Sequence, residues 1–254
     1  MFIDTHTHLF LNDFKNDIDN VIKNSIKSNV TKFLLPNIDS KTIDTMLNLT
    51  KKYPKICFPT IGIHPCSIKE NYKQELKIVE KELEKNKYYA IGEIGIDLYW
   101  DTKYIEEQKE AFEYQINIAL KENLPIIIHV RNSFNEIFEI LEKIKNKNLK
   151  GVFHCFSGDY KQAKKAIKMG FKLGVGGVVT YKNSNINRFL KNIDLKNIIL
   201  ETDSPYLSPE PYRGKRNDSS NIKIIAKKIA EIYEYDINYI AKITTENAEN
   251  LFKI

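Results

Sequence analysis

The sequence predicts a single α/β domain folded as a (β/α)8 TIM barrel. Its 254 residues match the usual length of such a barrel. Eight short apolar runs alternate with longer charged, amphipathic segments, which is the pattern of a parallel sheet with crossover helices. All five histidines fall at or just after the carboxyl end of one of these runs. In TIM barrels that end of the strands carries the active site, so the histidines indicate a site on one face.

The strands are predicted from the apolar runs, which are rich in Val, Ile, Leu and Phe. They cover residues 2–6, 32–36, 57–62, 89–93, 125–129, 151–154, 171–174 and 197–203. The spacing leaves room for a helix in every gap. No repeat, low-complexity tract or linker divides the chain, so we expect residues 1–254 to form one domain.

Helical periodicity is clearest over residues 105–122, where Phe112, Ile116 and Ala119 recur at spacings of three and four. The same pattern predicts helices over residues 135–147, 161–169, 221–233 and 237–252. Residues 204–217 differ, because they contain three prolines, one glycine and two arginines. We expect a long loop there, lying over the catalytic face.

The composition gives weaker indications. A formal net charge of +6, from 39 basic and 33 acidic residues, favours a polyanionic partner. Most basic residues are lysine, however, and biased nucleotide composition of the source genome explains such an excess equally well. Three cysteines without CxxC spacing argue against a disulfide framework and against a thiolate zinc site.

The expected location is the cytoplasm. Asp4, His6 and His8 stand where a signal peptide would need an unbroken apolar stretch, and no apolar run reaches membrane-spanning length. The cysteine pattern fits a reducing compartment. We therefore expect no membrane association, and the sequence indicates no obligate protein partner.

A first metal site is predicted from His6 and His8. Two residues apart on a strand, both side chains point into the barrel mouth and can share one ion, with Asp4 on the same face. Glu93 lies between glycines that allow close approach, and its two carboxylate oxygens can bridge two cations. The alternatives are packed histidines and a buried, ion-paired glutamate.

A second ion is predicted from His129 and His154, which end two apolar runs. Asp203 ends the last run, which returns beside the first, so it would complete the site of His6 and His8. The predicted ligands are His6, His8, Glu93, His129, His154 and Asp203. Such a set can hold two divalent ions, Zn, Mn or, in weaker fit, Mg, for in-line attack at phosphorus by a water molecule.

Other side chains receive predicted roles around this centre. Asp203 would take the proton of the attacking water, and Glu201 would accept a hydrogen bond from a liganding histidine. Arg131 shares the face of His129 and could hold the scissile phosphate bidentately. For Arg213 and Arg216, phosphate binding and simple solvation are equally good readings.

Two further predictions concern residues near the mouth. By strand parity, Cys155 points away from the rim and belongs to the core. Tyr99 and Trp100 follow the fourth strand, where they could stack on bases or pack over a helix.

The motifs together resemble the TatD family of metal-dependent deoxyribonucleases over essentially the whole chain. They are Asp4-Thr5-His6-Thr7-His8, Gly62-Ile63-His64-Pro65, Gly92-Glu93-Ile94-Gly95-Ile96-Asp97, Ile128-His129-Val130-Arg131, His154-Cys155-Phe156-Ser157-Gly158 and Glu201-Thr202-Asp203-Ser204-Pro205. The resemblance implies a TIM barrel of the amidohydrolase superfamily with the six ligands above. It also implies 3′–5′ exonuclease action on DNA, with RNA as a possible substrate, and a phosphate-side role for His64.

One motif departs from the family. After Arg213-Gly214-Lys215-Arg216-Asn217 the family usually continues with Glu-Pro, whereas this chain has Asp218-Ser219. The departure touches no predicted ligand but leaves the role of the loop open.

Alternative functions remain at this point. The same scaffold could hydrolyse esters, amides or phosphotriesters, or remove D-amino acids from tRNA, which some family members are said to do. Many related hydrolases bridge their ions with a carboxylated lysine, so Glu93 favours the TatD-like branch. A noncatalytic nucleic-acid-binding barrel is disfavoured, because structural zinc sites are normally closed sets of four ligands.

Overall fold

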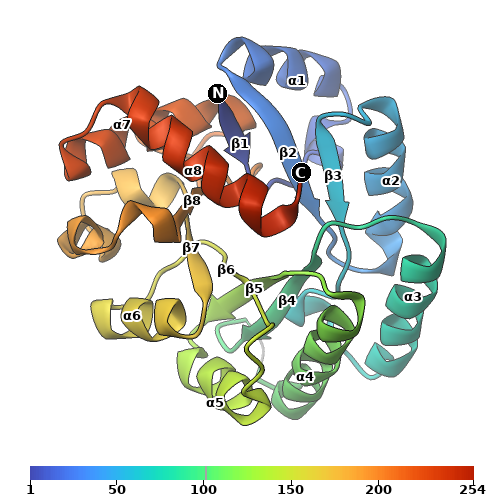
Figure 1. Ribbon diagram of the computed structural model, residues 1–254. Helices are drawn as coiled ribbons and strands as arrows, with labels where there is room; N and C mark the ends of the chain where they lie inside the picture. Colours follow the sequence, from blue (N-terminus) through green and yellow to red (C-terminus); the bar gives the residue numbers. More distant parts are fainter. Residues whose placement is uncertain (101) are drawn as a thin grey trace.

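The computed structural model describes residues 1–100 and 102–254. In these residues eight strands alternate with helices, and Figure 1 shows the helices arranged around the outside of the strands. The strands are β1 (Phe2–Asp4), β2 (Val30–Pro36), β3 (Cys57–Thr60), β4 (Ile91–Asp97), β5 (Ile126–Arg131), β6 (Gly151–Phe153), β7 (Phe171–Val175) and β8 (Ile198–Leu200). The α-helices are α1 (Ile18–Lys27), α2 (Ile43–Lys52), α3 (Tyr72–Lys85), α4 (Ile105–Glu122), α5 (Phe134–Ile144), α6 (Tyr160–Lys168), α7 (Ile222–Tyr233) and α8 (Ile237–Phe252).

The strands follow one another in chain order and are all parallel. Strands β1 to β3 form one sheet and β4 to β8 form a second. An isolated parallel bridge joins the sheets at each seam, between Thr7 and Ser204 and between Ile61 and Ile91. This is the predicted TIM-barrel fold, with the first predicted strand beside the last.

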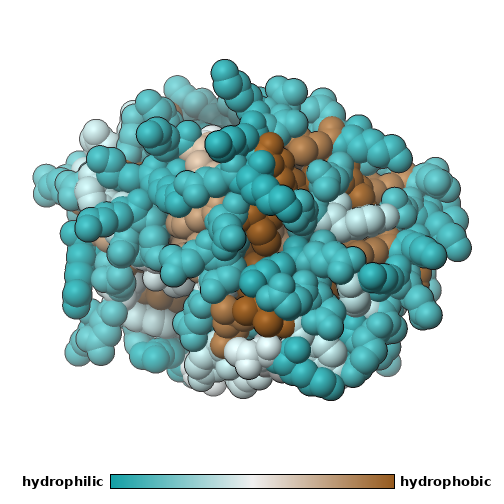
Figure 2. Space-filling model, turned by 90° about the horizontal axis from the view of Figure 1, so that it is seen from below, coloured by the Kyte–Doolittle hydropathy of each residue, from teal (hydrophilic) through white to brown (hydrophobic). Residues whose placement is uncertain are grey.

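The helices and strands bury the residues that their patterns predict. All seven residues of β4 are buried, as expected for a strand covered on both faces. Helix α4 buries Phe112, Ile116 and Ala119 and ends at Asn123, which adopts a left-handed φ of 53°. Figure 2 shows mostly hydrophilic side chains on the face seen from below, with hydrophobic residues in separate smaller areas. Across the described residues, no helix is long and apolar enough to cross a membrane.

Helix α8 closes the amino end of the barrel. Figure 1 shows it crossing in front of the strands. Its buried residues Ala248 and Phe252 pack in one cluster with residues from several strands and from the segment before β4. The strand contributors are Ile3, Leu34, Phe58, Ile127, Val152 and Ile199. With this end closed, the carboxyl ends of the strands form the only mouth that the described strands and α8 leave for a site.

Between β7 and β8 the sequence leaves room for a helix, but this described segment contains no α-helix. In its place lie four short 3-10 helices, at Gly177–Thr180, Ile186–Arg188, Leu190–Asn192 and Leu195–Asn197. The segment is rich in asparagine, whose side chain competes for backbone hydrogen bonds and disfavours α-helix. Asn187 illustrates this, since its amide donates to the carbonyl of Tyr181 at 3.4 Å.

Some predicted strand ends also differ from the structure. Strand β4 continues to Asp97 and β5 to Arg131, because their ladder pairs Gly95 with His129 and Asp97 with Arg131. Strand β8 instead ends at Leu200, and Asp203 follows it in a turn with a left-handed φ of 59°.

Candidate metal centre

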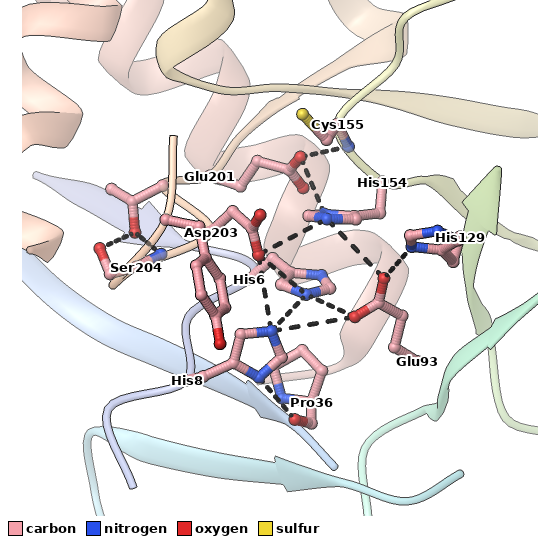
Figure 3. Close-up of polar contacts among 12 residues, drawn as sticks. His6, His8, Pro36, Glu93, His129, His154, Cys155, Glu201, Asp203 and Ser204 are labelled. Atoms are coloured by element: carbon pink, nitrogen blue, oxygen red, sulfur yellow. Dashed lines mark hydrogen bonds and ion pairs between the residues drawn. The ribbon is translucent and has the colours of Figure 1, made fainter. Parts of the chain in front are cut away.

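The six predicted ligands meet at the mouth of the barrel (Figure 3). One carboxylate oxygen of Glu93, Oε2, lies 3.1 Å from His6 Nε2 and 3.8 Å from His8 Nε2. The other, Oε1, lies 2.7 Å from His129 Nδ1 and 3.8 Å from His154 Nε2. Glu93 therefore stands between two pairs of histidines and turns one oxygen to each pair.

Asp203 closes one side of this cluster. Its Oδ1 lies 3.5 Å from His8 Nε2, and 3.7 Å from both His6 Nε2 and His154 Nε2. The backbone holds the aspartate there, because Asp203 N donates to the carbonyl of His6 at 2.8 Å. The turn after β8 thus docks on the segment after β1, as the ring closure of a barrel requires.

Close backbone packing brings Glu93 and His129 together. Gly95 has a φ of 151°, and a Cβ built there would lie 2.0 Å from the carbonyl oxygen of His129. Only glycine allows β4 and β5 to approach this closely. The glycines around Glu93 therefore serve the geometry that the sequence predicted for them.

Oxygen atoms behind three histidines favour one protonated ring nitrogen in each, through hydrogen bonds to His8 and His129 and an ion-pair contact to His154. His8 Nδ1 lies 3.1 Å from the Pro36 carbonyl oxygen, and His154 Nδ1 lies 3.0 Å from Glu201 Oε1. His129 Nε2 lies 2.9 Å from Asp97 Oδ2. Since these oxygens can only accept, the neutral rings turn their unprotonated nitrogens toward Glu93 and Asp203, as metal-binding histidines do.

Glu201 occupies the place that the sequence predicted for it. It is buried, and its Oε1 also accepts a hydrogen bond from Cys155 N. A Cβ at Gly174 would lie 2.4 Å from Glu201 Oε2, so this glycine makes room for the carboxylate. Glu201 is thereby fixed behind His154.

Asp97 has the matching role behind His129, a role that was not predicted from the sequence. Its Oδ1 accepts hydrogen bonds from Tyr99 N and Trp100 N at 2.9 and 3.1 Å, while Oδ2 faces His129. The signal was present, because Asp97 lies four residues after Glu93 on the same strand and shares its face.

The charges of the cluster favour bound cations. Burial alone would raise the pKa of Glu93, but the surrounding histidines lower it well below its usual value. The pKa of Asp203 is also lowered, since nearby histidines outweigh burial. Burial would lower the pKa of His154, but the carboxylates around it, Glu201 first, raise it to about 10. The carboxylates thus keep positive charge beside them, either protons on the rings or metal ions.

The donor set also fits a divalent metal. His6, His8 and Asp203 offer ligand atoms within 4.8 Å of one another, as do His6, Glu93 and His154. Imidazole nitrogens and carboxylate oxygens without thiolate suit Zn or Mn, and Mg less well.

His64 lies inside the cluster, but its ring is oriented to donate a hydrogen bond and not to bind a metal ion. Its Nε2 is 3.2 Å from His129 Nδ1 and 3.6 Å from Glu93 Oε1. Its Nδ1 accepts a hydrogen bond from Cys66 N at 3.1 Å, so the proton of the neutral ring must be on Nε2. Burial lowers the pKa of His64 and favours this neutral form. His64 therefore presents an N–H group, which suits a substrate oxygen better than a metal ion.

The predicted phosphate-binding arginines lie on two sides of the mouth. The exposed Arg131 stacks on Tyr99, with Cζ 3.9 Å from the ring centre, and lies 5.2 Å from the ring centre of Trp100. Arg213 lies over the Tyr181 ring at 4.5 Å. Arg216 is held away from the centre by Asp17, with Nη2 to Oδ2 at 2.6 Å.

The loop after β8 is anchored at several points. Asn217 Nδ2 donates to the carbonyls of Thr202 and Tyr206 at 2.9 and 2.7 Å. Asp218, where the family usually has glutamate, caps the 3-10 helix Ser219–Asn221 by accepting from Ser220 N at 2.9 Å. The departure from the family pattern therefore serves the local fold.

Two other residues differ from the sequence-based interpretation. Cys155 is only partly buried and has a left-handed φ of 41°, because β6 ends at Phe153 and strand parity no longer applies. Asp4 lies behind the cluster and accepts hydrogen bonds from Thr202 N and Oγ1 at 2.9 and 2.6 Å. Burial raises its pKa to about 7.

Known proteins are similar to this chain in sequence and fold. The chain matches the family described as TatD-related DNase over residues 3–253. It is 37% identical to the uncharacterized metal-dependent hydrolase YabD of Bacillus subtilis, with 100% of both chains covered. It is 34% identical to the uncharacterized metal-dependent hydrolase BU355 of Buchnera aphidicola, with 99% of each covered.

A solved structure agrees with these matches. The crystal structure of YjjV, a TatD homologue from Escherichia coli, superposes with a TM-score of 0.94 at 27% identity. The superposition covers 100% of this chain and 98% of that chain. The chain therefore belongs to the TatD-related DNase family and is a metal-dependent hydrolase.

Proposed function

We propose that the protein is a deoxyribonuclease that hydrolyses phosphodiester bonds from the 3′ end of DNA and uses two divalent metal ions. The observation that carries the proposal is the position of Glu93. Its Oε2 lies 3.1 Å from His6 Nε2 and its Oε1 lies 2.7 Å from His129 Nδ1. A carboxylate with one oxygen toward each histidine pair is arranged to bridge two ions, the centre used for in-line displacement at phosphorus.

The proposed ligands divide between the two oxygens of Glu93. His6 and His8 would hold one ion on the Oε2 side, and His129 and His154 the other on the Oε1 side. Asp203 lies nearest the first pair. Bound ions would supply Lewis-acid polarisation of the phosphate and a lowered pKa for the attacking water.

The protein's own groups then have distinct roles. Asp203 is a partly buried carboxylate whose pKa the histidines lower against the effect of burial, so it can accept the proton of the attacking water. His64 would donate its Nε2–H to a phosphate oxygen. Arg131, at the end of β5, would bind the same phosphate from the rim.

Three features favour nucleic acid as the substrate. The family is described as TatD-related DNase, and the net charge of +6 suits a polyanion. Tyr99 and Trp100 are exposed by 55% and 68% beside Arg131, as a surface for base stacking would require. RNA is the second candidate substrate, because the same side chains could bind its phosphates and bases.

The test is an end-labelled cleavage assay. Single- and double-stranded DNA and RNA, labelled at either end, are incubated with Mg, Mn or Zn and with the wild-type protein or Glu93→Ala. We expect stepwise release of nucleotides from the 3′ end of DNA and a loss of several orders of magnitude in the variant. Glu246→Ala, an exposed carboxylate on α8 at the opposite end of the barrel, is the matched control.

Two results would overturn the proposal. Unchanged cleavage by folded Glu93→Ala would remove the bridging role. Hydrolysis of D-aminoacyl-tRNA or of simple esters, with no cleavage of DNA, would assign the same metal centre to a different hydrolase.

A further inference from the structure

We propose that a cavity lined by the segments that follow β6, β7 and β8 binds the base of the nucleotide at the cleaved end, an inference that rests on the proposed nuclease function. The cavity has a volume of about 360 Å³. This lies at the small end of the range of ligand sites, roughly 300–1,000 Å³. It therefore suits one nucleotide rather than a duplex.

The residues that line the cavity follow two of the proposed metal ligands closely in the sequence. Its walls come from the segments that follow β6, β7 and β8, including Phe156, Tyr181 and Arg213. Phe156 lies two residues after His154, and Arg213 belongs to the loop that begins after Asp203. The cavity thus opens on the same face as the metal centre.

Hydrogen bonds between the loops hold the cavity in shape. Tyr181 Oη donates to the Ser208 carbonyl at 2.8 Å, and Glu210 N donates to Thr180 Oγ1 at 2.9 Å. A Cβ at Gly177 would lie 2.1 Å from the Leu207 carbonyl oxygen, so glycine is needed where the two loops touch. The walls are therefore built into the fold.

The lining favours a flat ligand with a polar edge. Phe156, Val178 and Ile186 supply an apolar surface. The guanidinium of Arg213 is stacked on Tyr181 at 4.5 Å, and such a pair offers a face for base stacking. The lining also includes Glu210, whose charge opposes binding of a second phosphate there.

A buried hydroxyl without a partner points to a ligand. Ser184 lines the cavity and is only 7% exposed, yet among the described residues its Oγ has no hydrogen-bond partner. A buried polar group normally has one, because burying it without a hydrogen bond destabilises the fold. Asn183 and Asn185 also line the cavity, and Asn side chains can pair with base edges.

Binding without turnover tests the proposal. Calorimetry on the metal-loaded protein compares the four deoxyribonucleoside 5′-monophosphates with 2-deoxyribose 5-phosphate, which has no base. We expect at least one nucleotide to bind tenfold or more tightly than the sugar phosphate. The exposed Asn185 is replaced by tryptophan to fill the cavity, and Ser184→Ala removes only the hydroxyl.

The variants have clear expected outcomes. Asn185→Trp should remove the preference for nucleotides, and Ser184→Ala should reduce it, while both keep the binding of the sugar phosphate. Asn20→Trp, at an exposed position on α1, is the matched control and should bind like the wild type. Thermal melting checks that each variant is folded.

The results distinguish this proposal from the nuclease function. Equal binding of nucleotides and sugar phosphate by the wild type would overturn the base site, as would an undiminished preference in folded Asn185→Trp. Base-dependent binding by a protein that cuts no DNA would keep the base site and reject the nuclease function.

Discussion

Asp97 Oδ2 lies 2.9 Å from His129 Nε2, and this contact determines which nitrogen His129 turns toward Glu93. The carboxylate is itself held by the backbone N–H groups of Tyr99 and Trp100. The orientation of one proposed ligand therefore depends on a residue that would touch neither metal nor substrate.

Replacing this carboxylate should weaken metal binding. In Asp97→Asn the amide keeps the shape of the side chain but removes the negative charge that makes His129 a stronger base. We expect affinity for Zn or Mn to fall by about 10–100-fold, which is typical for partners of metal-binding histidines. Titration against a chelating dye measures this, with Glu246→Gln on α8 as the control. An affinity equal to that of the wild type would show that Asp97 is not needed to orient the ring.

His64 should affect cleavage without affecting metal binding. Because Cys66 N donates to its Nδ1, the neutral ring has a proton on Nε2 and no free lone pair there. We expect His64→Ala to keep metal affinity within a few fold of the wild type and to lose about a hundredfold in kcat. A large loss of metal affinity in this variant would instead make His64 a ligand.

Replacing Gly174 by alanine should weaken metal binding by displacing Glu201, which lies behind His154. A Cβ there would lie 2.4 Å from Glu201 Oε2, so Gly174→Ala must displace the carboxylate that holds His154. We expect a tenfold or greater loss of metal affinity. Gly176→Ala is the matched control, because a Cβ at that position comes no closer than 3.5 Å to Glu201. Equal affinities for the two variants would contradict the role of Glu201.

Asp4 should make stability depend on pH. Burial raises its pKa from 3.8 to about 7, so the folded protein binds this proton more tightly than the unfolded chain. Its stabilising contribution is complete below pH 3.8 and is lost as pH rises through about 7. Between pH 5 and pH 8 this amounts to roughly 2–3 kcal/mol of unfolding free energy.

The measurement is urea unfolding at these two pH values with metal chelated, for the wild type and Asp4→Asn. The variant cannot titrate at this position, so it should lose less stability than the wild type on going to pH 8. Identical pH dependence in the two proteins would mean that Asp4 stays ionised in the fold.

The meeting of the six proposed ligands could be predicted because its signals are local. His129 and His154 each follow a short apolar run, and parallel strands bring the ends of such runs to one face. The two-residue period of a strand predicted that Glu201 lies deeper than Asp203 on the same face. In the structure Glu201 lies behind His154.

Other features of the site could not be predicted, because they depend on contacts between distant residues or on where a strand ends. Whether His64 is a donor or a ligand follows from the backbone N–H of Cys66, and no spacing in the sequence reveals that hydrogen bond. The prediction that Cys155 belongs to the core was wrong, because β6 ends at Phe153 and the alternation of a strand does not continue to Cys155. The gap between β7 and β8 has room for an α-helix but contains 3-10 helices, because the segment is rich in asparagine.

Bound metal ions should stabilise the two seams, where the three-stranded sheet meets the five-stranded sheet. His6 and His8 follow β1, in the three-stranded sheet, whereas Glu93, His129 and His154 belong to the five-stranded sheet or follow its strands. Ions held between them would add cross-links between sheets that an isolated bridge and a few backbone hydrogen bonds already join at each seam. The N–H groups of Thr5 and Ile61 donate across the two seams, to the carbonyls of Leu200 and Ala90. Their amide hydrogen exchange should accordingly quicken on chelation, while exchange at the centre of β5 stays slow. Uniform protection with and without metal would show that the sheets hold together unaided.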